Sequence, residues 1–261
     1  MKYMLIDAET NGLPDYKKPA DDPSQPRLAS LGIIMVNVAE DGTITIEAEH
    51  EFFVKPDGWS MSLEVILVNG LTTEFLLEHG IDLRDVLRKY TTLVEAGYVV
   101  VAYGAQHDCK ILRGELRRCG LPDHFEETKN VCLMRGIQPL KIPKANGKGG
   151  WPQLDDALRF FGHEPEAKPH GALAGARAAL KVFTALRNKD MLPEPAVHYA
   201  KNKPEPTSKP VSAPAVPAKK GDRKTENNVE LEHNGTQWLP IRNAHNYPKL
   251  YNADGSRKDA Q

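Results

Sequence analysis

A stretch of 32 residues, 193–224, limits what this chain can fold into. It contains seven prolines and seven Lys or Arg, and it has no Leu, Ile, Phe, Trp or Met. Such a segment buries too little apolar surface to offset the entropy lost on ordering, so we expect an extended, disordered linker. The 261 residues then divide into a folded domain at 1–192, the linker, and a tail at 225–261 that is too short for an independent core.

Composition excludes several classes of protein. Hydrophobic residues make up 40% of the chain and charged residues 26%, as in soluble globular proteins. Residues 1–192 contain 23 Lys or Arg against 27 Asp or Glu, so bound cations must help if this part handles phosphates. Three cysteines without a CxxC pair argue against a disulfide framework. Because no apolar run approaches the ~18 residues of a membrane span and no targeting signal is visible, we expect a cytoplasmic protein without membrane contact.

The order of apolar patterns predicts an α/β fold with a mixed sheet. An antiparallel meander, turning at Asp41-Gly42, is followed by alternating helices and a buried strand. The predicted strands cover 2–7, 30–38, 43–54 and 98–103. The predicted helices cover 82–95, 107–119, 153–161 and 171–188.

Two acids stand at the end of the first predicted strand, in I-D-A-E-T-N-G-L. Asp7 and Glu9 are two residues apart, so their side chains point to the same face of a strand and repel each other unless a cation is shared. An acidic turn closed by Asn11-Gly12 is the simpler alternative, but the T-x-G-L continuation favours a functional site.

This segment resembles the first motif, D-x-E-T-T-G-L, of the DEDDh 3′→5′ exonucleases, ribonuclease-H-like enzymes that include polymerase proofreading subunits and ribonuclease T. Further segments are similar in the same order, among them F-V-K-P at 53–56, V-N-G-L-T at 68–72 and T-K-N-V-C-L-M-R at 128–135. The resemblance covers residues 1 to about 190. It implies a ribonuclease-H-like mixed sheet flanked by helices.

The second motif of the family falls on A-Y-G-A-Q-H-D-C-K-I-L. Asp108 occupies the position of the acid, whereas Gly104 and His107 replace the usual Asn and Phe. Asp108 could also serve as a helix N-cap, since Asp accepts backbone N–H groups there. The two roles are compatible, and the buried strand before it favours a metal role.

The third motif, H-x-A-x-x-D, falls on H-G-A-L-A-G. His170 and Ala172 match, but Gly175 stands where the family has its last Asp. Glycine inside a helix costs about 1 kcal/mol relative to alanine, so helix stability does not account for it. From this difference we expect reduced or lost activity, and we expect Gly175→Asp to raise it.

The resemblance implies two Mg²⁺ or Mn²⁺ ions, which suit hard carboxylate ligands. Asp7, Glu9 and Asp108 would hold the metal ions and His170 would be the general base. Thr10 and Leu13 would bind the terminal nucleotides of the substrate. The implied reaction is the hydrolysis of single-stranded DNA or RNA from the 3′ end to nucleoside 5′-monophosphates, and the sequence does not choose between DNA and RNA.

The sequence also leaves two other functions open. One is a nucleic-acid-binding module that keeps the exonuclease scaffold without productive chemistry, which Gly175, Gly104 and His107 favour. The other is an adaptor that reaches a polymerase or another replication protein through the tail. Lys141, Lys144, Lys148 and Trp151 form a basic loop that could bind a single strand or simply be solvated. The helix face with Arg113, Arg117 and Arg118 is expected to be solvated.

Overall fold

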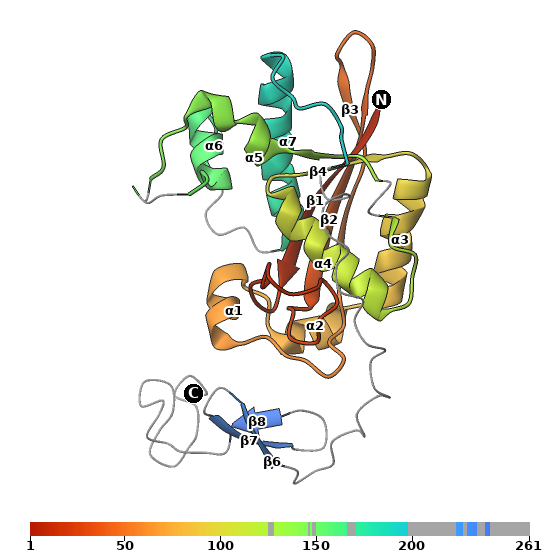
Figure 1. The fold of residues 1–261 in the computed structure, drawn as a ribbon, viewed down its shortest axis with the longest axis vertical. Helices are drawn as coiled ribbons and strands as arrows, with labels where there is room; N and C mark the ends of the chain where they lie inside the picture. The colour runs from red at the N-terminus through yellow and green to blue at the C-terminus, as the bar shows by residue number, and fades with distance from the viewer. Residues whose placement is uncertain are drawn as a thin grey trace. The chain divides into compact units, whose positions relative to one another are not determined.

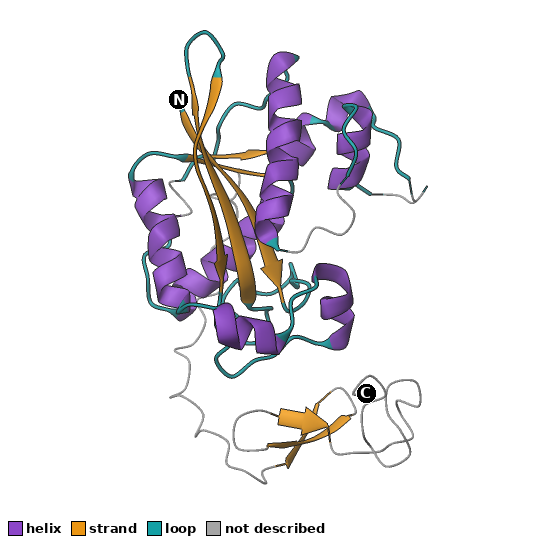
Figure 2. Ribbon diagram, turned by 180° about the vertical axis from the view of Figure 1, so that it is seen from behind, coloured by secondary structure: helices purple, strands orange, loops and turns teal. Residues whose placement is uncertain are grey.

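The computed structural model describes residues 1–124, 128–145, 147, 150–165 and 171–197, together with the backbone of 223–226, 229–233 and 238–240. The chain divides into two units, 1–208 and 209–261, each described by itself. The first unit has a five-stranded mixed sheet flanked by helices, which confirms the fold expected from the sequence (Figures 1 and 2).

The sheet is built around β1 (Lys2–Thr10), in the strand order β3-β2-β1-β4-β5. β2 (Leu28–Val38) pairs antiparallel with β1 and with β3 (Ile44–Phe53), as the meander predicted. β4 (Val99–Ala102) and the short β5 (Asn130–Cys132) add in parallel on the other side. The carboxyl end of the central strand is therefore flanked by elements from two distant parts of the chain.

Seven α-helices and one 3-10 turn lie in the described part of the first unit. They are α1 (Leu63–Asn69), α2 (Thr73–His79), α3 (Leu83–Glu95), α4 (Ala105–Arg118), α5 (Leu133–Gly136), η2 (Gln138–Leu140), α6 (Leu154–Phe160) and α7 (Ala172–Asn188). The four helices predicted from periodicity correspond to α3, α4, α6 and α7. The short α1 and α2 begin at polar caps: the Ser62 and Thr72 hydroxyl oxygens accept the N–H groups of Val65 and Phe75. None of the described helices is long and apolar enough to cross a bilayer.

Strand alternation sends the side chains of β1 to two separate cores. Met4 and Ile6 pack with α3 and α4, whereas Tyr3 and Leu5 pack with α5, α6 and α7. Figure 1 shows α4 in front of the sheet, and Figure 2, seen from behind, shows α7 along the opposite face. Because the odd-numbered residues point to α7, the two acids at positions 7 and 9 belong on that face.

The basic face of α4 holds the loop that leads into β2, so the expectation of a solvated face is wrong. Arg113 and Arg117 each place Nε 2.8 Å from Asp123 Oδ2. Arg118 Nη2 donates to the carbonyl oxygen of Asp22 at 2.9 Å. Guanidinium groups carry several donors in a fixed fork, which lets one helix face bind several carbonyl and carboxylate oxygens.

The first unit continues past the predicted boundary at Leu192. Ala196 exchanges two backbone hydrogen bonds with Asn130 of β5, at 2.9 and 3.1 Å. Pro193 lies so close to Gly136 that a Cβ there would meet Pro193 Cδ at 2.8 Å. Residues 193–197 are therefore part of the packed unit, and residues 198–222 of the predicted linker lie outside the described residues.

The second unit contains a three-stranded antiparallel sheet of β6 (Arg223–Glu226), β7 (Val229–His233) and β8 (Trp238–Pro240). Regular backbone thus begins at the last two residues of the predicted linker.

Candidate active site

Asp7 and Glu9 lie half-buried near the carboxyl end of β1. The strand delivers both to the face covered by α7, because their neighbours Tyr3 and Leu5 already pack on that side. No Lys or Arg in the described part of the chain forms an ion pair with either acid. The predicted acidic pair is therefore present, and within the described residues no Lys or Arg pairs with it.

Asp108 reaches the same place from α4. The helix begins at Ala105 after the N-cap Gly104, so Asp108 is the fourth helical residue and the N-cap alternative is wrong. Its Oδ1 accepts the backbone N–H of Ala8 at 3.0 Å, between the two acids of β1. This bond between positions 100 residues apart brings the second motif to the first.

All three carboxyl groups have a raised pKa, and burial is the largest cause for each. Burial and the charges of Asp108, Glu9 and Glu51 hold the pKa of Asp7 well above its usual range. Burial also raises the pKa of Asp108, to about 7, although its hydrogen bond from Ala8 acts in the opposite direction. The pKa of Glu9 is raised by burial and lowered in part by a hydrogen bond from Asn69 and by nearby His107. A site that disfavours negative charge in this way is one that a cation would stabilise.

Gly175 of α7 lies directly over Asp7. A Cβ at position 175 would overlap the Asp7 carboxylate, and a Cβ at Gly32 would overlap the backbone of Ala172 and Leu173. The absence of side chains at Gly32 and Gly175 allows α7 to approach β2 closely and leaves the Asp7 carboxyl group room under the helix. The third predicted motif thus meets the first, with Gly175 in place of the acid.

Glu51 is a fourth carboxyl group at this place, and sequence reasoning missed it. It lies on β3 opposite Gly32, which in turn lies opposite Asp7. Its Oε1 accepts the backbone N–H of Leu173 and the hydroxyl of Ser30, both at 3.3 Å. The alternation of residues in 43–54 could have indicated which side of β3 the Glu51 side chain faces. The strand register that aligns Glu51 with Asp7 could not be predicted from the local sequence.

The turn after β1 buries Thr10 and exposes Leu13, the two residues expected to bind substrate. Thr10 is buried and its hydroxyl donates to the carbonyl oxygen of Gly12 at 2.6 Å, as in a tight turn. Leu13 is 90% exposed, so it is not a core leucine. Asn69, buried at the end of α1, donates to the carbonyl oxygen of Thr10 at 3.3 Å and was also missed. The end of α1 therefore holds the segment that carries Glu9.

His170, the predicted general base, lies outside the described residues. Among the described His, Cys, Asp and Glu side chains, no group of three or more stands ready as a set of metal ligands. The donor chemistry nevertheless fits a hard divalent cation, because the carboxyl groups of Asp7, Glu9, Asp108 and Glu51 converge and carboxylate oxygens are the ligands that such a cation prefers. Binding such a cation would require these side chains to move closer together.

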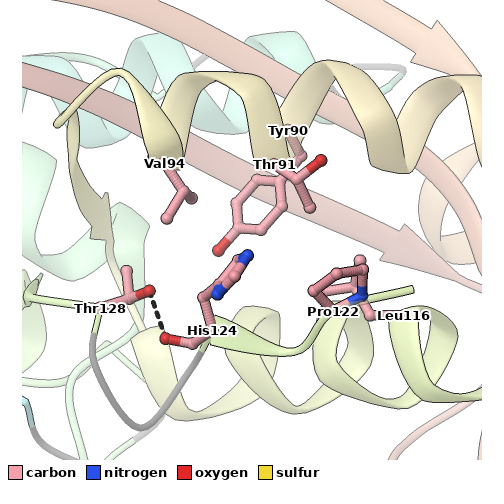
Figure 3. Close-up of a pocket in the computed structure, with 7 residues that line it drawn as sticks. All are labelled: Tyr90, Thr91, Val94, Leu116, Pro122, His124 and Thr128. Carbon is pink, nitrogen blue, oxygen red and sulfur yellow. Dashed lines mark hydrogen bonds between the residues drawn. The ribbon is translucent and has the colours of Figure 1, made fainter. Parts of the chain in front are cut away.

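A separate hollow between α3 and the segment after α4 offers no second site (Figure 3). Its volume of about 10 Å³ is room for no more than one water molecule. It is lined by Tyr90, Thr91, Val94, Leu116, Pro122, His124 and Thr128.

Comparison with known proteins gives one family. Residues 4–183 match the RNase T model, which is described as "Exonuclease". No individual curated protein sequence matches the chain.

Several solved structures are similar in fold. The nuclease domain of 3'hExo, a DEDDh family member bound to rAMP, has a TM-score of 0.57 and 16% identity; the match covers 75% of this chain and 96% of that one. A 3'-exonuclease in a structure of histone mRNA stem-loop recognition has a TM-score of 0.57 and 14% identity over 93% of this chain and 91% of that one. The zinc-bound form of the E. coli Exonuclease I complex with single-stranded DNA has a TM-score of 0.57 and 16% identity over 72% and 41%. At these identities the likeness establishes the fold alone.

Proposed function

Since the chain belongs to the exonuclease family, we propose that it is a 3′→5′ exonuclease of the DEDDh type acting on single-stranded DNA or RNA. The family match and the fold confirm the resemblance on which the sequence analysis relied. The observation that supports the proposal most is the convergence of Asp7, Glu9 and Asp108 at the end of β1. These are the three acids that the first two family motifs predict.

Asp7, Glu9 and Asp108 would hold two divalent cations, Mg²⁺ or Mn²⁺. Held by these residues, divalent cations would supply positive charge beside the scissile phosphate and would lower the pKa of a bound water. The protein's own contribution is positional: Asn69 fixes the backbone at Thr10, and the Ala8 N–H fixes the Asp108 carboxylate. Hydrolysis would release a nucleoside 5′-monophosphate and leave a new 3′ hydroxyl. We assign the proton-accepting role to His170 from the family motif.

The exposed Leu13 supports contact with the substrate. Leu13 is 90% exposed, four residues after Glu9 and directly after the turn that the Thr10 hydroxyl closes, so its side chain is available to pack against the terminal bases. Thr10 would contribute through the backbone of the same turn.

The test is incubation of the full-length protein with 5′-labelled single-stranded DNA and RNA in Mg²⁺, Mn²⁺ or EDTA. We expect a ladder of products shortened from the 3′ end in metal and none in EDTA, and we expect Asp7→Asn to reduce the rate about a hundredfold or more. Asp57→Asn, on an exposed residue, is the matched control. Cleavage that starts within the strand, or equal activity of Asp7→Asn, would contradict the proposal.

The missing acid at Gly175 favours the alternative of a nucleic-acid-binding module. That alternative is supported if the protein binds the labelled strands tightly but releases no mononucleotide in any metal. A polymerase or another replication protein as partner of the C-terminal tail stays a prediction.

A further inference from the structure

Glu51 and Asp7 lie on one face of the sheet, on either side of Gly32. Asp7 pairs with Gly32, and Gly32 pairs with Glu51, so the three residues form one row across β1, β2 and β3. Directly opposed residues of antiparallel strands share a face, and neighbouring strands lie about 4.8 Å apart. Gly32 has no side chain, and the backbone of Ala172 and Leu173 at the start of α7 lies over it, between the two acids. Among the charges that raise the pKa of Asp7, Glu51 is one.

The start of α7 is shaped around both carboxyl groups. A Cβ at Gly171 would overlap Glu51, and a Cβ at Gly175 would overlap Asp7. Gly171 has φ of 91°, a conformation that glycine adopts without strain. Each carboxyl group thus occupies volume that a side chain of the helix would otherwise fill. Glu51 therefore lies beside the start of α7, the helix on which Gly175 replaces the last acid of the family motif.

We propose that Glu51 supplies the carboxylate that Gly175 lacks and serves as a ligand of the divalent cation at this site. This inference rests on the proposed function. The acid would come from β3 in place of α7, on the same face of the sheet and beside the same helix. Asp7, Glu9, Asp108 and Glu51 then restore a set of four acids.

Capping of α7 does not account fully for Glu51. Both hydrogen bonds, from Leu173 and Ser30, go to Oε1 at 3.3 Å, and Oε2 has no hydrogen bond within the described part of the chain. Glu49, two residues earlier on the same face, differs: Arg177 of α7 donates from Nε to its Oε2 at 3.0 Å. One acid of the pair is neutralised by the helix and the other is left with an oxygen available to a cation.

The test compares Glu51→Gln with Glu49→Gln in the full-length protein. Glutamine keeps the oxygen that accepts from Leu173, so a cap survives the change, while the negative charge is lost. Mn²⁺ affinity is measured by calorimetric titration, with the melting temperature in EDTA as the check on folding. We expect Glu51→Gln to weaken Mn²⁺ binding at least about tenfold, and Glu49→Gln to leave it within about twofold.

The possible results separate the inference from the proposed function. Equal Mn²⁺ affinity of Glu51→Gln and the unmodified protein, with metal-dependent exonuclease activity present, overturns the role of Glu51 alone. Equal weakening by both variants also overturns it, because general loss of negative charge then explains the effect. An unmodified protein that neither binds Mn²⁺ nor hydrolyses DNA or RNA overturns the inference together with the proposed function.

Discussion

The Asp7 carboxyl group is surrounded by like charges and covered by a helix that leaves it space. Asp108, Glu9 and Glu51 all raise its pKa, and Gly175 is the residue whose missing side chain makes room for it. Raised pKa values in a cluster of acids are typical of functional sites, since a stable core would avoid them. At this scale the structure explains why glycine, although unfavourable in a helix, occupies position 175.

Asp108→Asn should stabilise the metal-free protein at high pH. Because folding raises the pKa of Asp108 to about 7, the folded state holds a proton more tightly than the unfolded chain, and this group's contribution to stability is lost as pH rises from about 4 through 7. Asparagine keeps an oxygen for the Ala8 N–H and acquires no negative charge as the pH rises. In EDTA at pH 8 we expect a melting temperature higher by a few degrees, at about 2–4 °C per kcal/mol.

The same variant should respond less to metal. In millimolar Mn²⁺ the unmodified protein should gain stability by mass action, and Asp108→Asn should lose most of that gain. Thermal melts at pH 4.5 and pH 8, with EDTA or Mn²⁺, check both effects. Identical pH profiles for the two proteins in EDTA would contradict the argument.

Gly175→Ala should weaken Mn²⁺ binding although alanine favours helix. The added Cβ overlaps the Asp7 carboxylate, so Asp7 has to move away from its neighbours. We expect Mn²⁺ affinity to fall by roughly tenfold, the scale seen when the supports of metal ligands are lost. Titration calorimetry measures it. Gly175→Asp, expected from the sequence to raise activity, has to displace Asp7 in the same way before its carboxyl group can contribute.

At the scale of elements, α4 joins the site to the loop before β2. Its first turn carries Asp108, and further along it Glu115 is fully buried and accepts from Arg27 Nε at 2.8 Å and from the N–H of Leu28 at 3.0 Å. Gly114, next to Glu115 on the same helix, lies against the backbone of Ala20. The helix thus acts as a support on which the segment between β1 and β2 is packed.

Gly114→Ala should destabilise the protein. In an exposed helix the change gains about 1 kcal/mol, but here the new Cβ would overlap the carbonyl oxygen of Ala20, which is backbone and cannot rotate away. We expect a net loss of about 1–3 kcal/mol and a melting temperature lower by several degrees. Denaturant titration measures the free energy of unfolding. A more stable variant would contradict this expectation, because it would show that the loop around Ala20 shifts away from α4 at no cost in stability.

On the scale of the whole molecule, the residues after α7 return to the edge of the sheet. Ala196 pairs with Asn130 of β5, and Pro193 packs against Gly136 of α5, before the first unit ends at Ser208. The short β5 therefore has a neighbour on its open edge, which protects its backbone groups from pairing with other chains.

Two truncated proteins test whether residues 193–197 stabilise the first unit. Ending the chain after Ser208 should leave the melting temperature of the first unit unchanged, because both Asn130–Ala196 hydrogen bonds remain. Ending it after Leu192 removes them and the Pro193 contact, and should lower the free energy of unfolding by about 1–3 kcal/mol. Calorimetry of the two proteins measures the difference. Equal melting temperatures would support the domain boundary predicted at residue 192.

Much of the fold and part of the site followed from local patterns. The alternation in residues 2–7, the turn at Asp41-Gly42 and the helical periodicity of 82–95 predicted elements that the structure contains. The two-residue spacing of Asp7 and Glu9 placed both on one face. These signals are read along the chain, because strand and helix periods are set by backbone geometry over a few residues.

Only the tertiary structure brought Glu51 into the site. Between Met35 and Val36 the pairing of β2 with β3 shifts by one residue, leaving Glu47 as an extra residue in β3. Without this bulge, the register near the turn would place His50 opposite Gly32 and turn Glu51 to the other face. The contacts that accompany the shift are made by distant residues: Tyr98 donates to Glu47, and Leu173 and Arg177 of α7 donate to Glu51 and Glu49. The sequence by itself determined which residues are acidic and where strands begin, and long-range packing decided which of these acids meet.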